Sequence, residues 1–288
     1  MRKSRLALLL VIMAVIIMTI IGCGNKDENV GAPATGDNIL RMVTADEQTT
    51  CDVQKTTEYY TVPLNIFERL VETQTNLDGT SELVPGLAER WDISDDGLVY
   101  TFYLRKGVKF HNGEEFKADD VLYTFERMLK PETNALNQDF ITAIKGAIDM
   151  MEGNADKLTG LEVVDDYTIK VTLESPFAPF LANIATPGVS IYNRKFTEEA
   201  GDQFGLLPEK TCGTGPFKLS KWELNSETQV DAFDGYWKGR AKLDGVNWKT
   251  VKDADTQRMM FENGELDEFD CDEAPSQISY FANSEKYK

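Results

Sequence analysis

Residues Glu82 to Leu129 read ELVPGLAERWDISDDGLVYTFYLRKGVKFHNGEEFKADDVLYTFERML and contain the clearest structural signals in the chain. The first part, Leu83 to Arg90, predicts a loop that runs into a short helical turn. Residues 95–97, Asp-Asp-Gly, favour a tight turn, because glycine adopts positive φ freely and aspartate tolerates it. Residues 98–105 then alternate between two faces and are rich in aromatic and β-branched side chains, which is typical of a half-buried strand.

The period changes to that of a helix from Ala118 onward. Apolar residues recur at helical spacing up to Leu129, two aspartates occupy the first turn where they suit the helix dipole, and Pro131 ends the element. A second turn is expected before the helix, at residues 111–113, His-Asn-Gly. The stretch therefore predicts a hairpin packed against an amphipathic helix.

Periodicity predicts further elements on both sides of this stretch. They are a strand at 39–44, a helix at 61–71, a helix at 140–151, a hairpin at 161–173, a helix near Glu198, a strand entered through residues 213–217, and a helix at 256–267. No internal repeat is visible along the sequence.

The composition of the chain limits its partners. Its 288 residues include 48 Asp plus Glu against 30 Lys plus Arg, a net charge of -18. This length allows a sizeable core and more than one folding unit. Because nucleic-acid affinity depends largely on neutralising phosphates, the charge argues against a nucleic-acid partner. We interpret the acidity as a solvated, soluble surface.

The N-terminal residues predict export rather than a part of the fold. A basic start precedes the apolar run Leu6 to Ile21, whose length suits a signal peptide or a short transmembrane helix. The run ends in Ile-Ile-Gly-Cys, which resembles the lipobox of bacterial lipoproteins and implies a signal peptide at 1–22 and a lipid on Cys23. Residues 23–37 are expected to form a flexible tether, because this segment is polar and rich in Gly, Ala and Pro. The sequence thus predicts a soluble body that is lipid-anchored on the extracytoplasmic face of a membrane.

Few residues of the body suggest chemistry of their own. His111 is the only histidine, which is too few nitrogen ligands for an ordinary transition-metal site, so we interpret it as a structural or surface residue. Residues 213–215, Gly-Thr-Gly, lack the ending of a phosphate loop and are expected to let the chain turn into a core strand. The acidic cluster at 267–273 lacks the spacing of an EF-hand. No catalytic motif of an acyl-transfer enzyme or a metallohydrolase is visible, and we expect no cofactor and no metal.

Three cysteines lie in the body, Cys51, Cys212 and Cys271. No CxxC pattern occurs, and each cysteine lies in or beside an apolar or strand-like run, so we interpret them as buried free thiols. Export permits disulfides, and a single bond among the three stays open, with no pair favoured by the sequence.

Several segments match the wording of a known family. They are LAERWDISDDGLVYTFYLRKGVKFHNGEEFKADDV at 87–121, GTGPF at 213–217 and DGYWKG at 234–239. In these segments the chain resembles the extracellular solute-binding proteins, family 5, the peptide-, dipeptide- and nickel-type binding subunits of ABC importers. The resemblance spans residues 38–281, whereas members of the family continue through a further lobe. We therefore expect the chain to be an N-terminal fragment or a truncated product of a longer binding protein.

The resemblance implies a type II periplasmic-binding-protein-like α/β fold with an extra inserted α+β domain. Lobe I would be split between residues 38–71 and 190–270. The inserted small domain would span residues 72–189. Residues 271–288 would begin a second lobe that is largely missing from this chain.

Three places are candidate ligand contacts. Glu58, Tyr59 and Tyr60 come first, because adjacent aromatics on an extended segment point to opposite sides, and the resemblance implies that this loop lines the cleft. By the same resemblance, Asp272 and Glu273 border the cleft and would accept hydrogen bonds from a cationic or peptide ligand. Thr186 and Gly188 would lie at a crossing between lobes. Core packing of the tyrosines and plain solvation of the carboxylates stay open as alternatives.

The implied function is capture of an extracellular solute by closure of two lobes, followed by delivery to a membrane permease. Short peptides are the first choice of ligand, and metal chelates or oligosaccharides are the second. The partners would be the ABC permease and ATPase subunits, and we expect a monomer without enzyme activity. An exported lipoprotein hydrolase and an adhesion or signalling module are alternatives of another class. A chain with one lobe is expected to bind its ligand weakly or not at all.

Overall fold

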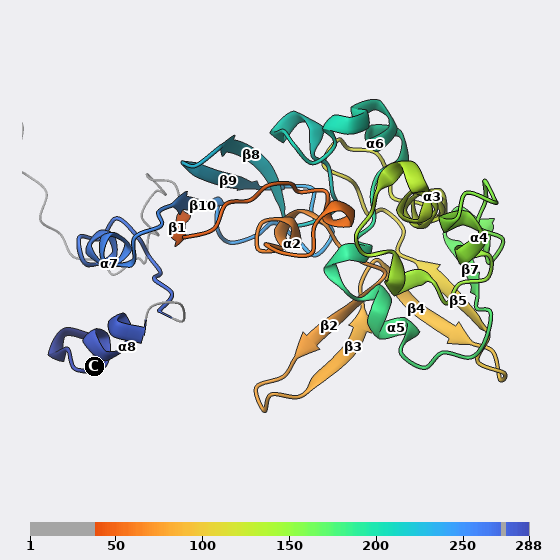
Figure 1. The fold of residues 1–288 in the computed structure, drawn as a ribbon, viewed down its shortest axis with the longest axis horizontal. Coiled ribbons are helices and arrows are strands. Elements are labelled where there is room, and N and C mark those ends of the chain that lie inside the picture. The colour runs from red at the N-terminus through yellow and green to blue at the C-terminus, as the bar shows by residue number, and fades with distance from the viewer. Residues whose placement is uncertain (1–37, 272–274, 288) are drawn as a thin grey trace, which may run out of the picture. The chain divides into compact units, whose positions relative to one another are not determined.

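The computed structural model describes residues 38–271 and 275–287, so the predicted signal peptide, Cys23 and the tether lie outside the described part. The strands form three sheets, of four, two and four strands (Figure 1). Short helices and 3-10 turns connect them. Strands and helices are therefore mixed along the body, as the sequence predicts.

The first sheet is built from distant parts of the sequence. Its strand order is β1 (Ile39–Thr44), β10 (Gly245–Thr250), β9 (Glu227–Ala232) and β8 (Phe217–Glu223). β1 and β10 run parallel, with Thr44 beside Thr250, and lie side by side in Figure 1, whereas the other pairs are antiparallel. A parallel pair brings the carboxyl ends of both strands to the same edge. The segments that follow Thr44 and Thr250 therefore meet at one edge of the sheet.

The stretch at 82–129 contributes to a second four-stranded sheet, which is entirely antiparallel. Its order is β4 (Ala88–Ile93), β5 (Val99–Leu104), β7 (Thr168–Thr172) and β6 (Leu161–Asp165). Tyr100, Phe102 and Leu104 are buried, which confirms the alternation expected of β5. The helix α3 (Ala118–Leu129) shares this core and ends before Pro131, as the sequence predicts.

A two-stranded hairpin and shorter elements complete the fold. The hairpin pairs β2 (Val71–Thr75) with β3 (Ser81–Pro85). The other helices are α2 (Pro63–Ile66), α4 (Ala147–Met151), α5 (Phe180–Ile184), α6 (Arg194–Ala200), α7 (Ala254–Glu262) and α8 (Pro275–Ala282). The 3-10 turns are η2 (Val53–Lys55), η3 (Pro131–Thr133), η4 (Gln138–Ile141), η5 (Pro187–Val189), η6 (Gly201–Gln203), η7 (Pro208–Lys210) and η8 (Glu285–Tyr287). Within residues 38–271 and 275–287, no helix has both the length and the apolar character needed to cross a bilayer.

Buried apolar side chains gather in two separate clusters. One cluster draws on residues 70–191 together with Cys212. The other draws on residues 51–67 and 192–248. The chain therefore crosses from one core to the other just before Leu70 and again after Ile191. The division into a split lobe I and an inserted domain stays a prediction, which these two crossings support.

Two predicted elements are wrong, because distant partners override the local pattern. Residues 83–90 form the end of β3 and the start of β4 instead of a loop and a helical turn, since β2 and β5 pair with this segment. The helix expected at 61–71 is reduced to α2. The carbonyl of Ile66 accepts the N–H of Gly215 at 2.8 Å, and the chain continues extended from Phe67 into β2.

Two further helices are shorter than the sequence predicts. The helix expected at 140–151 is interrupted by Gly146, which has a φ of 80°, so that only α4 follows it. A left-handed residue cannot continue a right-handed helix. α7 is capped by Asp253 and ends at Glu262 rather than at Asp267. The strand at 39–44, the hairpin at 161–173 and the helix near Glu198 are confirmed as β1, β6–β7 and α6.

Candidate functional site

A groove with a volume of about 500 Å³ lies at the edge of the first sheet where β1 and β10 end. In open α/β sheets, ligands commonly bind just beyond the carboxyl ends of the strands. The groove is therefore the candidate functional site. Its lining residues are Met42, Val43, Thr44, Ala45, Asp46, Gln48, Tyr59, Thr61, Val62, Thr228, Trp248, Thr250, Lys252, Ala254, Gln257, Glu268 and Asp270.

The floor of the groove is a row of side chains across three strands. Met42 on β1 is in register with Trp248 on β10, which is in register with Thr228 on β9. Residues directly opposite each other on neighbouring strands place their side chains on the same face. Because Trp248 is only 5% exposed, its indole supplies a well-packed apolar base for the groove.

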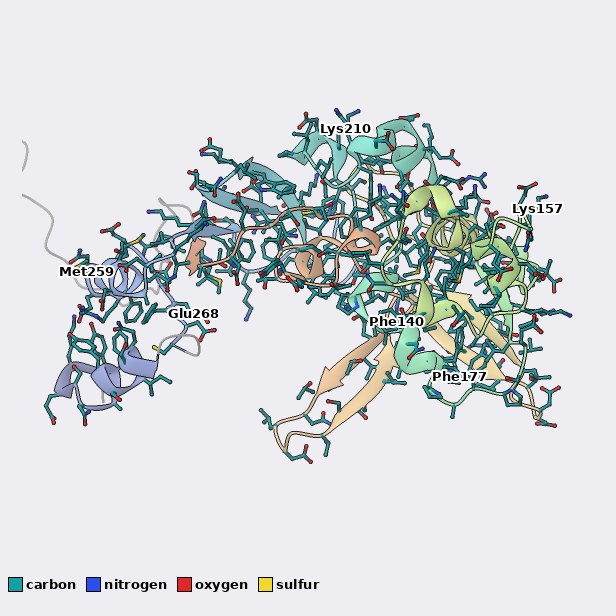
Figure 2. The ribbon with its side chains drawn as sticks, viewed as in Figure 1. Phe140, Lys157, Phe177, Lys210, Met259 and Glu268 are labelled. Carbon is teal, nitrogen blue, oxygen red and sulfur yellow. The ribbon has the colours of Figure 1, made fainter. Side chains whose placement is uncertain are left out.

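The charges that line the groove are mostly negative. Asp46, Glu268 and Asp270 line it together with one basic residue, Lys252. Glu268, labelled in Figure 2, follows the end of α7. Clefts lined by one sign of charge concentrate ligands of the opposite sign. The groove therefore favours a ligand that carries a positive group.

The loop with the first predicted site residues contributes Tyr59 to the groove. Tyr59 is 40% exposed and has a φ of 58°. This left-handed backbone costs a residue with a Cβ about 1–2 kcal/mol, so other contacts must hold it. Tyr60 is half-buried, its hydroxyl donates to the carbonyl of Thr56 at 2.8 Å, and burial raises the pKa of this phenol. Glu58 is exposed and lies outside the lining set.

The remaining predicted site residues do not line the groove in the described part of the structure. Thr186 precedes η5, and Gly188 is buried within η5 against the side chain of Asn137. Neither contributes to the groove wall. Asp272 and Glu273 lie outside the described residues, although the groove does include their neighbour Asp270.

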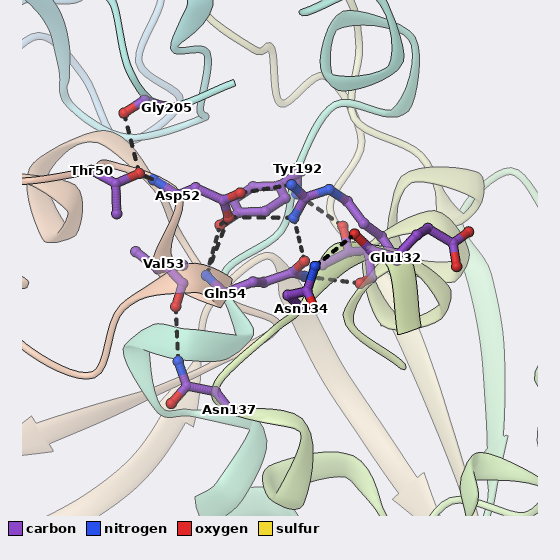
Figure 3. Close-up of polar contacts among 11 residues, drawn as sticks. Thr50, Asp52, Val53, Gln54, Glu132, Asn134, Asn137, Tyr192 and Gly205 are labelled. Carbon is purple, nitrogen blue, oxygen red and sulfur yellow. Dashed lines mark hydrogen bonds and ion pairs between the residues drawn. The ribbon is translucent and has the colours of Figure 1, made fainter. Parts of the chain in front are cut away.

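A buried polar network surrounds Asp52 and Gln54, which precede Tyr59 in the sequence (Figure 3). Asp52 is 1% exposed and accepts hydrogen bonds from Arg127 Nη2 at 2.6 Å and from the Tyr192 hydroxyl at 2.9 Å. Arg127 also donates to the side chain of Gln54, which itself donates to the carbonyl of Thr124 at 3.0 Å. Burial, reinforced by the Asp52 carboxylate, raises the pKa of Tyr192 well above its usual value. The network ties Asp52 and Gln54 to helix α3.

His111 has a structural role. Its Nδ1 accepts the N–H of Gly213 at 3.2 Å, which we assign to the tautomer whose Nε2–H donates to the carbonyl of Gly215 at 3.0 Å. Burial lowers the pKa of this imidazole to about 4. Both ring nitrogens are thus occupied by the loop that enters β8. Within the described residues, no group of three or more His, Cys, Asp or Glu side chains has the arrangement of a metal site.

The tight loop at 213–215 is shaped by close backbone contact. A Cβ on Gly213 would lie 2.0 Å from the carbonyl oxygen of Ile66, so only glycine fits there. This agrees with a turn into a core strand rather than a phosphate loop. Cys51 and Cys212 are buried free thiols, and burial raises their pKa values to about 12 and about 11.

A second hollow of about 620 Å³ lies on the antiparallel sheet. Its lining includes Tyr103, Lys106 and Tyr167. None of the predicted site residues that the structure describes lines it, and it lies away from the carboxyl ends of β1 and β10. We therefore treat the groove as the functional site.

Sequence reasoning missed most of the groove. Asp46 and Lys252 follow β1 and β10, and only the parallel pairing of these strands brings them together. The pairing joins segments about 200 residues apart, for which a single sequence gives no local signal. Asp46, shortly after the strand predicted at 39–44, was the available hint, whereas no strand was predicted at 245–250.

Comparison with known proteins places the chain in a family. The family described as bacterial extracellular solute-binding proteins, family 5 Middle, matches residues 82–288. The chain is 35% identical over 222 residues to the dipeptide-binding protein of Escherichia coli (strain K12), and 36% identical over 222 residues to heme-binding protein A of Haemophilus influenzae. Each match covers 73% of this chain and 39% of the relative.

Solved structures agree with the fold expected from the sequence. The substrate-binding domain of an oligopeptide ABC transporter from Bacillus anthracis superimposes with a TM-score of 0.75 at 32% identity, over 80% of this chain and 45% of that chain. This confirms the mixed α/β solute-binding fold and shows that only part of it is present. The chain spans about two fifths of the length of the curated relatives it matches. Because the family match covers well over half of the sequence, the chain belongs to the bacterial extracellular solute-binding proteins of family 5.

Proposed function

We propose that this chain is part of a binding protein that captures short peptides outside the cytoplasmic membrane for an ABC importer. The groove at the ends of β1 and β10 is the observation that carries the proposal. It combines an aromatic floor, the exposed phenol of Tyr59 and several carboxylates, which suit the apolar, hydrogen-bonding and cationic parts of a peptide. The names of the relatives, a dipeptide-binding protein and an oligopeptide transporter domain, support the same class of ligand.

The mechanism we propose is capture between two lobes. The groove would supply one wall, and a further lobe would close over it by a hinge motion, so that the closed form is delivered to the permease. The ABC permease and ATPase subunits are the proposed partners, and the protein is proposed to act as a monomer. A chain that offers one wall of the cleft is expected to bind peptides weakly.

We propose an extracytoplasmic location with a lipid anchor at Cys23. The family is one of bacterial extracellular proteins, and the apolar run at 6–21 before Cys23 supports export. A Cys23→Ala variant is expected to leave the membrane fraction on cell fractionation. Distribution of this variant identical to that of the unmodified protein would contradict the anchor.

A metal chelate such as haem is the second candidate ligand, because one relative at 36% identity is named a heme-binding protein. The only histidine, His111, has both ring nitrogens hydrogen-bonded within the fold and does not line the groove. Axial coordination of haem by histidine is therefore not offered by this chain. Peptides remain the proposed ligands.

The proposal is tested by calorimetric titration of the purified chain with di-, tri- and tetrapeptides and, separately, with hemin. Saturable heat with peptides, lost in a Tyr59→Ala variant, is the expected result. A Tyr103→Ala variant is the matched control, because Tyr103 lines the other hollow. Binding of hemin alone, or peptide binding insensitive to Tyr59, would overturn the assignment.

A further inference from the structure

The left-handed backbone of Tyr59 requires support from outside the groove. We call residues 56–62 the ligand loop, since they contain Tyr59, Thr61 and Val62 of the groove wall. Residues with a Cβ persist in this conformation only where surrounding contacts over-determine it. Within the loop, Thr56 Oγ1 accepts the N–H of Glu58 at 3.1 Å and donates to its carbonyl at 2.8 Å. Because both bonds lie within the loop, they do not attach it to the rest of the fold, and other contacts must do so.

One buried side chain connects the ligand loop to the segment before it. Asn137 is 4% exposed, and its Nδ2 donates to the carbonyls of Val53 and Thr56, each at 2.8 Å (Figure 3 shows the bond to Val53). The same Nδ2 lies 3.3 Å from the hydroxyl of Tyr60. Next to it, the N–H of Leu136 donates to the carbonyl of Gln54 at 2.7 Å. The Asn137 amide thus fixes the start of the ligand loop, and it shares the Thr56 carbonyl with the hydroxyl of Tyr60, which donates to the same oxygen at 2.8 Å.

The position of Asn137 depends in turn on Gly188. A Cβ added at Gly188 would lie 2.7 Å from Nδ2 and 2.8 Å from Cγ of Asn137. Gly188 is buried and has no positive φ, so its backbone suits alanine, and the three atoms nearest to an added Cβ all belong to Asn137. Glycine at this position is therefore explained by the space that the Asn137 amide occupies.

We propose that Asn137 and Gly188 are positioning residues for ligand binding, which hold the ligand loop so that Tyr59 faces the groove. Both residues come from the segment predicted to be the inserted domain, and neither lines the groove. The inference rests on the proposed function, because the loop's position matters through the ligand. It assigns Gly188 a role behind the binding surface rather than the ligand contact that the sequence suggested.

Hydrogen exchange of the ligand-free chain, read by mass spectrometry, tests the structural half of the proposal. Asn137→Ala and Gly188→Ala are expected to speed exchange in residues 56–62 by about tenfold, the factor that corresponds to about 1.4 kcal/mol. Asn183→Ala is the matched control, because it removes a similar side-chain bond, to the carbonyl of Phe140 in the turn η4 that follows Asn137, but no bond to the ligand loop. Unchanged exchange in residues 56–62, or equal acceleration throughout β5, would overturn the proposal.

Peptide affinity of the same variants, introduced into the full-length protein of which this chain is proposed to be part, tests the functional half. Both variants are expected to bind peptide about tenfold more weakly than the unmodified chain, while Asn183→Ala binds normally. Adding Gly188→Ala to Asn137→Ala is expected to weaken binding by a smaller factor than Gly188→Ala does alone, because the amide is already gone and only the Cβ of residue 137, 3.0 Å from the new Cβ, remains in its way. Normal affinity in Asn137→Ala, or full additivity in the double variant, would refute positioning. Absence of peptide binding by the unmodified full-length protein would instead count against the proposed function, and the exchange experiment would still decide the role of Asn137.

Discussion

Loss of Arg127 is expected to destabilise the fold far more than loss of an exposed cation. The Asp52 carboxylate is 1% exposed and the Arg127 side chain 12%, and they meet at 2.6 Å. In an Arg127→Met variant the carboxylate keeps only the Tyr192 hydroxyl and the N–H of Gln54. An uncompensated buried charge of this kind costs about 3–5 kcal/mol in free energy of unfolding. In a chain of this size, that corresponds to a melting temperature lower by about 6–20 °C.

The assay is urea unfolding of the purified chain, followed by tryptophan fluorescence. Lys195→Met is the control, because the Lys195–Glu114 pair has side chains 69% and 39% exposed, and a solvent-exposed ion pair contributes little to stability. The double variant Asp52→Asn, Arg127→Met should lose less than the sum of the two single variants by about 0.5–3 kcal/mol, since it removes both charges. A loss in Arg127→Met no larger than in the control, or strict additivity in the double variant, would refute this account of the network.

Three further outcomes follow from the described contacts. In a tag-free chain the single imidazole NMR resonance of His111 should titrate with a pKa of about 4 in the folded state and near 6.5 in urea. Because the unfolded chain takes up the proton at a higher pH than the folded chain does, the stability that neutral His111 contributes is present above about pH 6.5 and is lost as the pH falls toward 4. A folded-state midpoint near 6.5 would contradict the buried, hydrogen-bonded ring. Cys51 and Cys212 should resist iodoacetamide at pH 8 in the native chain and react after unfolding, because burial raises the pKa of both thiols. Rapid labelling of either thiol in the native chain would contradict its burial. Lysine-containing dipeptides should bind severalfold more tightly than glutamate-containing ones, as expected for exposed ion pairs. Calorimetry should show that this preference vanishes in the double variant Asp46→Asn, Glu268→Gln, and a preference for acidic peptides would contradict the negative charge of the groove.

The parts of the fold that the sequence predicts are those determined by local pattern. The alternation at 98–105 predicts a strand and the helical spacing from Ala118 predicts a helix, because each element buries one face against the same core. The helix expected at 61–71 fails because the bond from Gly215 to Ile66 ends α2 and lets the chain extend into β2. Such a bond between distant segments leaves no trace in the local periodicity.

The candidate site was predictable only in its loop. Alternation indicated that Tyr59 and Tyr60 face different ways, and the structure places Tyr59 along the groove and Tyr60 inward. Their role in ligand binding stays a prediction, as does that of Asp272 and Glu273, which lie outside the described residues. The pairing of β1 with β10 was needed to find Asp46 and the rest of the groove wall, and packing against Asn137 was needed to understand Gly188.

Native mass spectrometry of the protein, purified from its host without refolding, tests the central claim most directly. Mass shifts that match co-purified short peptides, and that exchange on addition of a defined peptide mixture, are the predicted result. A clean ligand-free mass of the full-length protein, with both walls of the cleft, that does not change when the peptide mixture is added would contradict the assignment to peptide capture.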